Sequence, residues 1–210
     1  MTPILLPLLF AVLLWWAGTT AVLLLDHRPV RNHGRSLKLA TLGAALALAA
    51  LVGLRDVATP LGAYLGFACA LLIWGWHELS FLTGRVTGPR RSGCPTGCAG
   101  VRHARHAFEA ISHHEYALFA TLALLLALAW NAANPLGAWT FLLLWVMRVS
   151  AKLNLFLGVR NPGSELLPAP LQYLTSFFGR RTWNPLLPVS LSGIAAISEP
   201  ASSTGGGARR

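Results

Sequence analysis

Five stretches of apolar residues, each about as long as a lipid bilayer is thick, constrain the fold more than any other feature of this chain. They cover residues 3–25, 37–54, 59–82, 110–130 and 135–157. A helix needs about 20 apolar residues to cross the hydrocarbon core, and it satisfies its backbone hydrogen bonds within itself. The sequence therefore predicts an all-α fold, a polytopic bundle of about five transmembrane helices within residues 1–158.

The composition agrees with a membrane protein. Hydrophobic residues make up 54% of the chain and charged residues 11%, with a mean hydropathy of +0.55, whereas about a quarter of a soluble domain is charged. The 17 Lys and Arg residues outnumber the 7 Asp and Glu residues. Because the basic residues lie in short loops and form no continuous stripe, their pattern indicates membrane topology and argues against nucleic acid as a partner.

Loop charge predicts the orientation. Basic residues gather in the first and third connections between the apolar segments, at Arg28, Arg31, Arg35 and Lys38, and at Arg85, Arg90, Arg91, Arg102 and Arg105. The second connection holds one basic residue, Arg55, and the fourth holds none. The positive-inside rule then places the N-terminus outside and the segment after residue 157 inside. The first segment lacks the features of a cleaved signal peptide and is predicted to remain as an anchor.

Polar side chains interrupt three of the predicted helices at a similar depth, near the cytoplasmic side. A charge at the bilayer centre costs about 2.5 to 3.5 kcal/mol, so such residues are expected to face the bundle interior and to have partners. This polar layer consists of His77, Glu78, His113, His114, Glu115, Arg148 and Lys152. Trp74, His77, Glu78 and Phe81 follow helical spacing, which predicts one shared face.

Four interpretations of the polar layer remain open. Glu78 and Glu115 can pair with Arg148 and Lys152, which would join three helices without a ligand. A histidine can contact a pigment or haem, or the layer can serve as a proton or ion pathway. The fourth interpretation is a metal site, with His77, Glu78, His114 and Glu115 as candidate ligands. However, the side chains of adjacent His and Glu residues on a helix point about 100° apart, whereas the di-iron sites of helix bundles use Glu-x-x-His spacing.

The third connection holds a glycine-rich basic stretch and two cysteines. The stretch 84-GRVTGPRRSG-93 lacks the lysine of a P-loop. Its arginines Arg85, Arg90 and Arg91 are expected to contact anionic lipid head groups or the acidic surface of another subunit. Cys94 and Cys98 are predicted to be free thiols in a reducing compartment. A zinc site would need two further ligands, for which His103 and His106 are close enough in sequence.

The C-terminal region differs from the bundle. Five prolines interrupt the apolar residues of 161–188, which is typical of an interfacial or loosely packed segment rather than a spanning helix. We therefore predict a Pro-rich interfacial segment over 159–197 and a disordered tail over 198–210, which is rich in Ser and Gly.

Several separated motifs, in order, resemble one known family. The motifs are 77-HELSFLTGRVTGPRR-91, 94-CP-95, 113-HHE-115, 145-WVMRVSAKLNLFLGVRN-161 and 165-ELLPAPLQYLTSFF-178. Over residues 10–190 the chain resembles the photosynthetic complex assembly protein 2 family, the PuhE-type membrane proteins of anoxygenic phototrophic bacteria. The matching positions are His77, Glu78, Gly84, Gly88, Pro89, His114, Glu115, Arg148, Lys152 and Asn154, so the resemblance adds Asn154 to the polar layer.

The resemblance implies a non-enzymatic assembly factor in the bacterial inner membrane, encoded near the reaction-centre H subunit. Its expected partners are reaction-centre or light-harvesting subunits, and bacteriochlorophyll or another tetrapyrrole is the expected contact. Members normally continue past the position of Pro188 with further hydrophobic segments, so a shortened C-terminus is expected here. The alternative is a membrane metalloenzyme of oxidase type that acts on a pigment or isoprenoid through the same layer.

Overall fold

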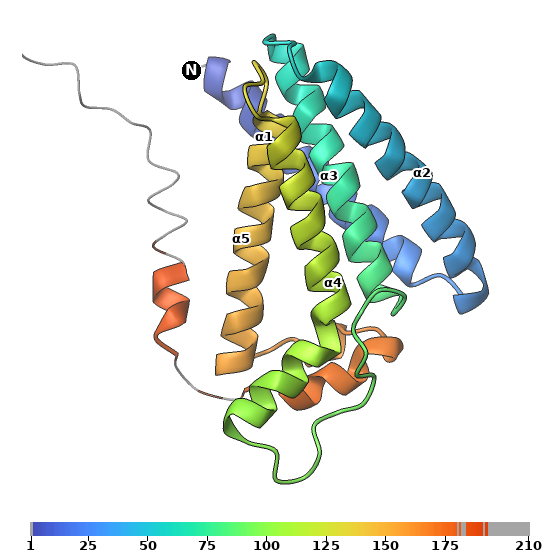
Figure 1. Ribbon diagram of the computed structural model, residues 1–210, viewed down its shortest axis with the longest axis vertical. Helices are drawn as coiled ribbons and strands as arrows, with labels where there is room; N and C mark the ends of the chain where they lie inside the picture. The colour runs from blue at the N-terminus through green and yellow to red at the C-terminus, as the bar shows by residue number, and fades with distance from the viewer. Residues whose placement is uncertain (1, 180, 182–183, 191, 193–210) are drawn as a thin grey trace, which may run out of the picture. The chain divides into compact units, whose positions relative to one another are not determined.

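Five long helices dominate the computed structural model, which describes residues 2–179, 181, 184–190 and 192 (Figure 1). They are α1 (Thr2–Asp26), α2 (Val30–Leu54), α3 (Pro60–Leu82), α4 (Gly100–Leu128) and α5 (Leu136–Leu157), followed by two 3-10 helices, η1 (Ser164–Leu166) and η2 (Ala169–Phe177). Each of the five is long and apolar enough to cross a membrane. The all-α, multi-pass fold predicted from the sequence is confirmed.

Two helices begin earlier than predicted. Helix α2 starts at Val30, directly after Pro29, and α4 starts at Gly100, whereas the sequence predicted starts at residues 37 and 110. Hydropathy marks where a helix enters lipid. The stretches before that point contain Arg, His and Ala, which are also compatible with a helix, so each helix begins before its apolar part. Helix α3 begins as predicted, because the Thr59 hydroxyl accepts a hydrogen bond from the Gly62 N–H at 3.1 Å.

The chain divides into two compact units. The first comprises Met1–Val146 and Gly163–Phe177, and the second comprises Met147–Pro162 and Phe178–Arg210. The predicted boundary after residue 158 therefore differs from the observed one, since η2 belongs with the first unit. Its side chains Leu171, Leu174 and Phe177 recur every three residues and are buried, so the expectation of loose packing is wrong for this stretch. The predicted tail, 198–210, lies outside the described residues.

Helix α3 is the central helix of the first unit and packs against α1, α2 and α4. The core includes Ile73 and Trp74 of α3, Leu118 and Leu122 of α4, and Phe141 of α5. The Trp74 and Phe141 rings meet edge to face with their centroids 5.3 Å apart. Lipid provides no hydrophobic driving force between helices, so this packing stabilises the bundle mainly through van der Waals contact.

Helix α1 is packed much less. Most of its large apolar side chains are exposed, as expected for a surface that faces lipid acyl chains. Its described contacts with α3 include Phe10, whose ring lies 4.7 Å from that of Tyr64 and 6.1 Å from that of Phe67. Helix α1 is therefore a peripheral helix of the first unit.

Candidate functional site

Two buried histidines form the centre of the polar layer in the first unit. His77 of α3 is 1% exposed and His114 of α4 is 0% exposed, and their ring centroids lie 6.1 Å apart. A hydrogen bond of 3.0 Å joins His77 Nε2 to the hydroxyl of Thr121 on α4. The ring of Phe81 lies 4.6 Å from His114, and that of Phe141 lies 5.9 Å from His77. The two imidazoles are therefore packed among aromatic rings.

Helical spacing explains how α3 supplies this site. Trp74, His77 and Phe81 recur at i, i+3 and i+7 and are all buried, as the sequence predicted. Glu78, which the sequence predicted on the same face, is only half-buried. The aromatic and imidazole groups thus share the packed face, and the carboxylate lies at its margin.

Helix α4 separates its two adjacent histidines. His114 is buried, whereas His113 is exposed and Glu115 is half-buried, because successive helical residues differ by about 100° in direction. The structure therefore brings His77 and His114 together and does not bring His113 to them.

The remaining members of the polar layer lie on the part of α5 that belongs to the second unit. Arg148 and Lys152 are half-buried. The amide nitrogen of buried Asn154 donates to the Ser150 carbonyl at 2.9 Å and to the Ser190 hydroxyl at 3.1 Å. Asn154 therefore fixes residues within its own unit. The pairing of Glu78 and Glu115 with Arg148 and Lys152 stays a prediction.

The basic loop after α3 docks on the backbone of α4. The His114 N–H donates to the Thr87 carbonyl at 3.0 Å, and the Arg90 N–H donates to the Glu109 carbonyl at 3.4 Å. A β-carbon at Gly88 would overlap the Glu109 carbonyl oxygen, so only glycine fits this close approach.

Figure 1 shows that α4 changes direction along its green part. We call residues 84–112 and 163–177 the cytoplasmic cap, after the side on which the positive-inside rule predicts them.

The arginines of this loop have different roles. Arg90 Nε lies 3.3 Å from one carboxylate oxygen of Glu109, and Arg105 Nε lies 3.2 Å from the other. Arg85 and Arg91 are exposed. One of the three predicted contact residues therefore stabilises the cytoplasmic cap, and the other two present their charge at its surface.

Cysteines and histidines meet in the cytoplasmic cap. Within the part of the chain that the structure describes, one group of three side chains has the spacing of metal ligands, namely Cys94, Cys98 and His106. The intramembrane candidates His77, Glu78, His114 and Glu115 make no such group there. Cys94 and Cys98 are joined by a disulfide, so the expectation of free thiols is wrong for this structure. A turn brings them together, with Gly97 at φ 74° and the Cys98 N–H bonded to the Pro95 carbonyl at 3.2 Å.

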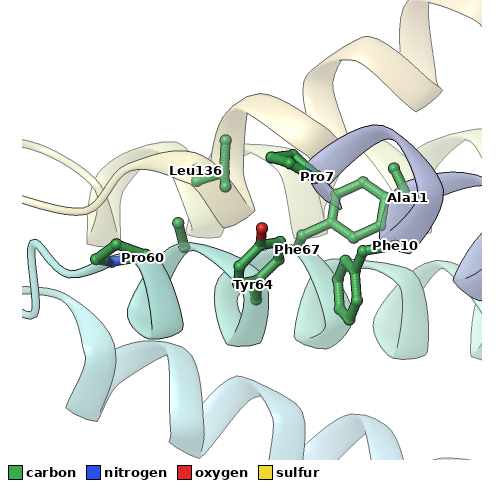
Figure 2. Close-up of a pocket in the computed structure, with 8 residues that line it drawn as sticks. Pro7, Phe10, Ala11, Pro60, Tyr64, Phe67 and Leu136 are labelled. Carbon is green, nitrogen blue, oxygen red and sulfur yellow. The ribbon is translucent and has the colours of Figure 1, made fainter. Parts of the chain in front are cut away.

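An apolar pocket of about 300 Å³ lies beside α1 and α3, apart from the polar layer. Figure 2 shows Phe10 from α1 and Tyr64 and Phe67 from α3 around it. Its lining residues are Pro7, Phe10, Ala11, Pro60, Ala63, Tyr64, Phe67 and Leu136. Since the Tyr64 phenol is the one ionisable group among them, this pocket suits an apolar chain rather than acid–base chemistry.

Sequence reasoning missed two residues of the site, Thr121 and Thr87. Thr121 follows His114 by seven residues and therefore shares its helical face, so the spacing of polar residues along α4 contained this signal. Thr87 contributes through its carbonyl oxygen. No side-chain pattern identifies a residue that acts through its backbone.

Comparison with known proteins assigns the chain to a family. Over residues 1–201 it matches the family described as "Protein of unknown function (DUF3623)". The chain belongs to this family. A relative from Rhodobacter capsulatus, described as "Uncharacterized 30.4 kDa protein in puhA 5'region", is 36% identical over 189 residues, which cover 88% of this chain and 69% of the relative. No solved structure matches the chain significantly.

Proposed function

We propose that this protein is a non-enzymatic assembly factor for bacterial photosynthetic complexes, located in the inner membrane. It engages reaction-centre or light-harvesting subunits within the bilayer and at the cytoplasmic surface. Two observations support a photosynthetic role: the ordered PuhE-type motifs between residues 77 and 178, and the relative described by its position 5′ of puhA. Five helices long and apolar enough to cross a membrane support a membrane location.

The observation that carries this proposal is the contrast between His113 and His114. His114 is enclosed by packed rings, whereas His113 lies on the exposed side of α4. Tyr116 and Phe119 on the same helix are each 60% exposed. A polar group on a lipid-facing helix is costly unless a partner satisfies it. Subunits of the photosynthetic complexes, or a bacteriochlorophyll that they carry, would satisfy the imidazole.

Burial also shows which histidine of the polar layer has room to contact a pigment. An axial ligand to the magnesium of a bacteriochlorophyll needs open space for the macrocycle, and both His77 and His114 are fully packed. His113 is the histidine of the polar layer with an accessible ring. At the membrane surface, Arg85 and Arg91 add positive charge that favours an acidic subunit surface.

A complementation experiment tests the proposal. In a phototrophic host, deletion of the gene is expected to lower the near-infrared absorbance of assembled complexes, and the wild-type gene to restore it. His113→Leu should restore it only in part, while His27→Leu, at an exposed histidine of the first connection, should restore it fully. Normal complex levels in the deletion strain would contradict the assembly role.

A purification experiment tests the pigment contact separately. The full chain is purified in mild detergent from pigment-producing cells and its absorption spectrum is recorded. Bound bacteriochlorophyll is expected with the wild-type protein and is expected to be lost with His113→Leu. A spectrum without any tetrapyrrole would remove pigment from the proposal and would leave assistance through protein contacts.

A further inference from the structure

The geometry of the cytoplasmic cap points to a structural metal site. We propose that, in the dithiol form of the chain, Cys94, Cys98, His103 and His106 bind one zinc ion. This proposal is independent of the assembly role. It concerns the chemistry of the cap itself, whichever partner the protein assists.

Local structure brings both histidines beside the two sulfurs. The 94-CPTGC-98 turn places both sulfurs next to the start of α4, which begins at Gly100. His103 and His106 follow at i and i+3 on the first turns of α4, so they share a face. A turn that supplies two cysteines and a helix that supplies two histidines is an arrangement suited to a closed Cys₂His₂ zinc site.

Three sulfur–nitrogen distances fit a tetrahedral ion. His103 Nδ1 lies 3.2 Å from the sulfur of Cys94 and 3.7 Å from that of Cys98. His106 Nδ1 lies 3.5 Å from the sulfur of Cys98. Zn–S bonds of about 2.3 Å and Zn–N bonds of about 2.0 Å at tetrahedral angles separate sulfur from nitrogen by about 3.5 Å. The observed sulfur–nitrogen distances therefore bracket the value that zinc requires. The two sulfurs, which the disulfide joins, would separate to about 3.8 Å around the ion.

The compartment favours thiols over the disulfide seen between Cys94 and Cys98. The positive-inside rule places this loop in the cytoplasm, where disulfides are rare. Newly made chains carry thiols, so zinc binding needs no reductant. Two thiols lose two protons as two Zn–S bonds form, and no electron is transferred. Arg102, which donates to the Gly97 carbonyl of this turn at 3.0 Å, favours the thiolates that result.

A metal here would join three parts of the cytoplasmic cap. The Cys94 N–H already donates to the Ser176 hydroxyl at 2.9 Å, and the ring of His103 lies 5.7 Å from that of Phe177 on η2. Zinc would tie the loop to α4, and these contacts would tie both to η2. All four coordination positions are filled by protein, which is typical of a structural rather than a catalytic zinc.

Metal analysis of the whole protein tests the site. The full chain is purified in detergent with a phosphine reductant and without chelators, and zinc is measured by mass spectrometry. About one equivalent per chain is expected; less than about a tenth of an equivalent, together with no uptake of added Zn²⁺, overturns the proposal. In parallel, cells are lysed into a thiol-alkylating reagent. Alkylation of both Cys94 and Cys98 after zinc is chelated supports the dithiol form, and their recovery as a disulfide overturns it.

Cobalt substitution and matched variants identify the ligands. Co²⁺ should give the thiolate charge-transfer and tetrahedral ligand-field bands of a two-sulfur site. His106→Phe should weaken zinc binding by at least about 100-fold, since even outer-shell changes cost 10 to 100-fold. His106→Cys should keep the metal and strengthen the charge-transfer band, which a merely structural role for His106 does not explain. Cys69→Ser and His27→Ala are the controls and should change neither zinc binding nor the cobalt spectrum. Loss of metal in these controls would overturn the assignment, and so would full metal binding by His106→Phe.

Discussion

The polar layer and the loop of the cytoplasmic cap both pack against α4, yet they are held to it in different ways. In the polar layer, side chains contact side chains, as when His77 binds Thr121 and His114 packs on Phe81. In the cytoplasmic cap, the loop around Gly88 is held against α4 by its backbone. We therefore expect stability to depend on side-chain chemistry in the polar layer and on the close fit of the backbone at Gly88 in the cap.

The largest effect is expected in the cytoplasmic cap, at Gly88. Gly88→Ala places a β-carbon on the Glu109 carbonyl, so the loop must leave α4 and lose its hydrogen bonds to the helix. We expect a loss of more than about 4 kcal/mol in the free energy of unfolding, measured in detergent. Gly43→Ala on α2 is the matched control, because a β-carbon there meets nothing within 4 Å. Equal stability of the two variants would contradict the role of the close approach.

The second prediction concerns the ion pairs expected within the polar layer. If Glu78 pairs with Lys152, Glu78→Gln and Lys152→Met should each cost about 2 kcal/mol, below the 3 to 5 kcal/mol of a fully buried pair because both side chains are half-buried. The double variant should recover most of this loss, which a double-mutant cycle measures. Additive losses would show that the two residues do not interact.

A smaller effect is expected for the hydrogen bond between His77 and Thr121. His77→Phe keeps the ring volume but removes the nitrogen that meets the Thr121 hydroxyl, so we expect a loss of about 1 kcal/mol. Thr121→Val removes the other partner. Their coupling energy in a double-mutant cycle should be about 1 kcal/mol, and a value near zero would mean that packing alone fixes the imidazole.

The smallest effect is expected for the ion pairs of Glu109. Glu109→Gln weakens the contacts to Arg90 and Arg105, which are partly exposed and therefore screened by water and salt. We expect a loss of about 0.5 kcal/mol that shrinks as ionic strength rises. Thermal unfolding in detergent at low and high salt measures it. A loss as large as that of Gly88→Ala would show that side-chain charge, not backbone fit, holds the cap.

Hydropathy and helical spacing predicted much of the first unit correctly. The five apolar segments became five helices, and the spacing of Trp74, His77 and Phe81 identified a buried face. The starts of α2 and α4 were placed too late, because a hydropathy pattern reports entry into lipid and not the first helical hydrogen bond. The packing of η2 was missed because prolines in 161–188 concealed the three-residue spacing of Leu171, Leu174 and Phe177.

The sequence by itself determined the fold class, the number of long apolar helices and the polar character of particular helix faces, because helical periodicity and the cost of exposing backbone to lipid are local properties. Only the tertiary structure decided that His114 is enclosed while His113 is exposed, that Gly88 lies against α4, and that Cys94, Cys98, His103 and His106 converge. These facts depend on how separate segments of the chain approach one another, such as α3 and α4, or the loop after α3 and the start of α4. That approach is set by backbone contacts and side-chain packing, which no local pattern of residues records.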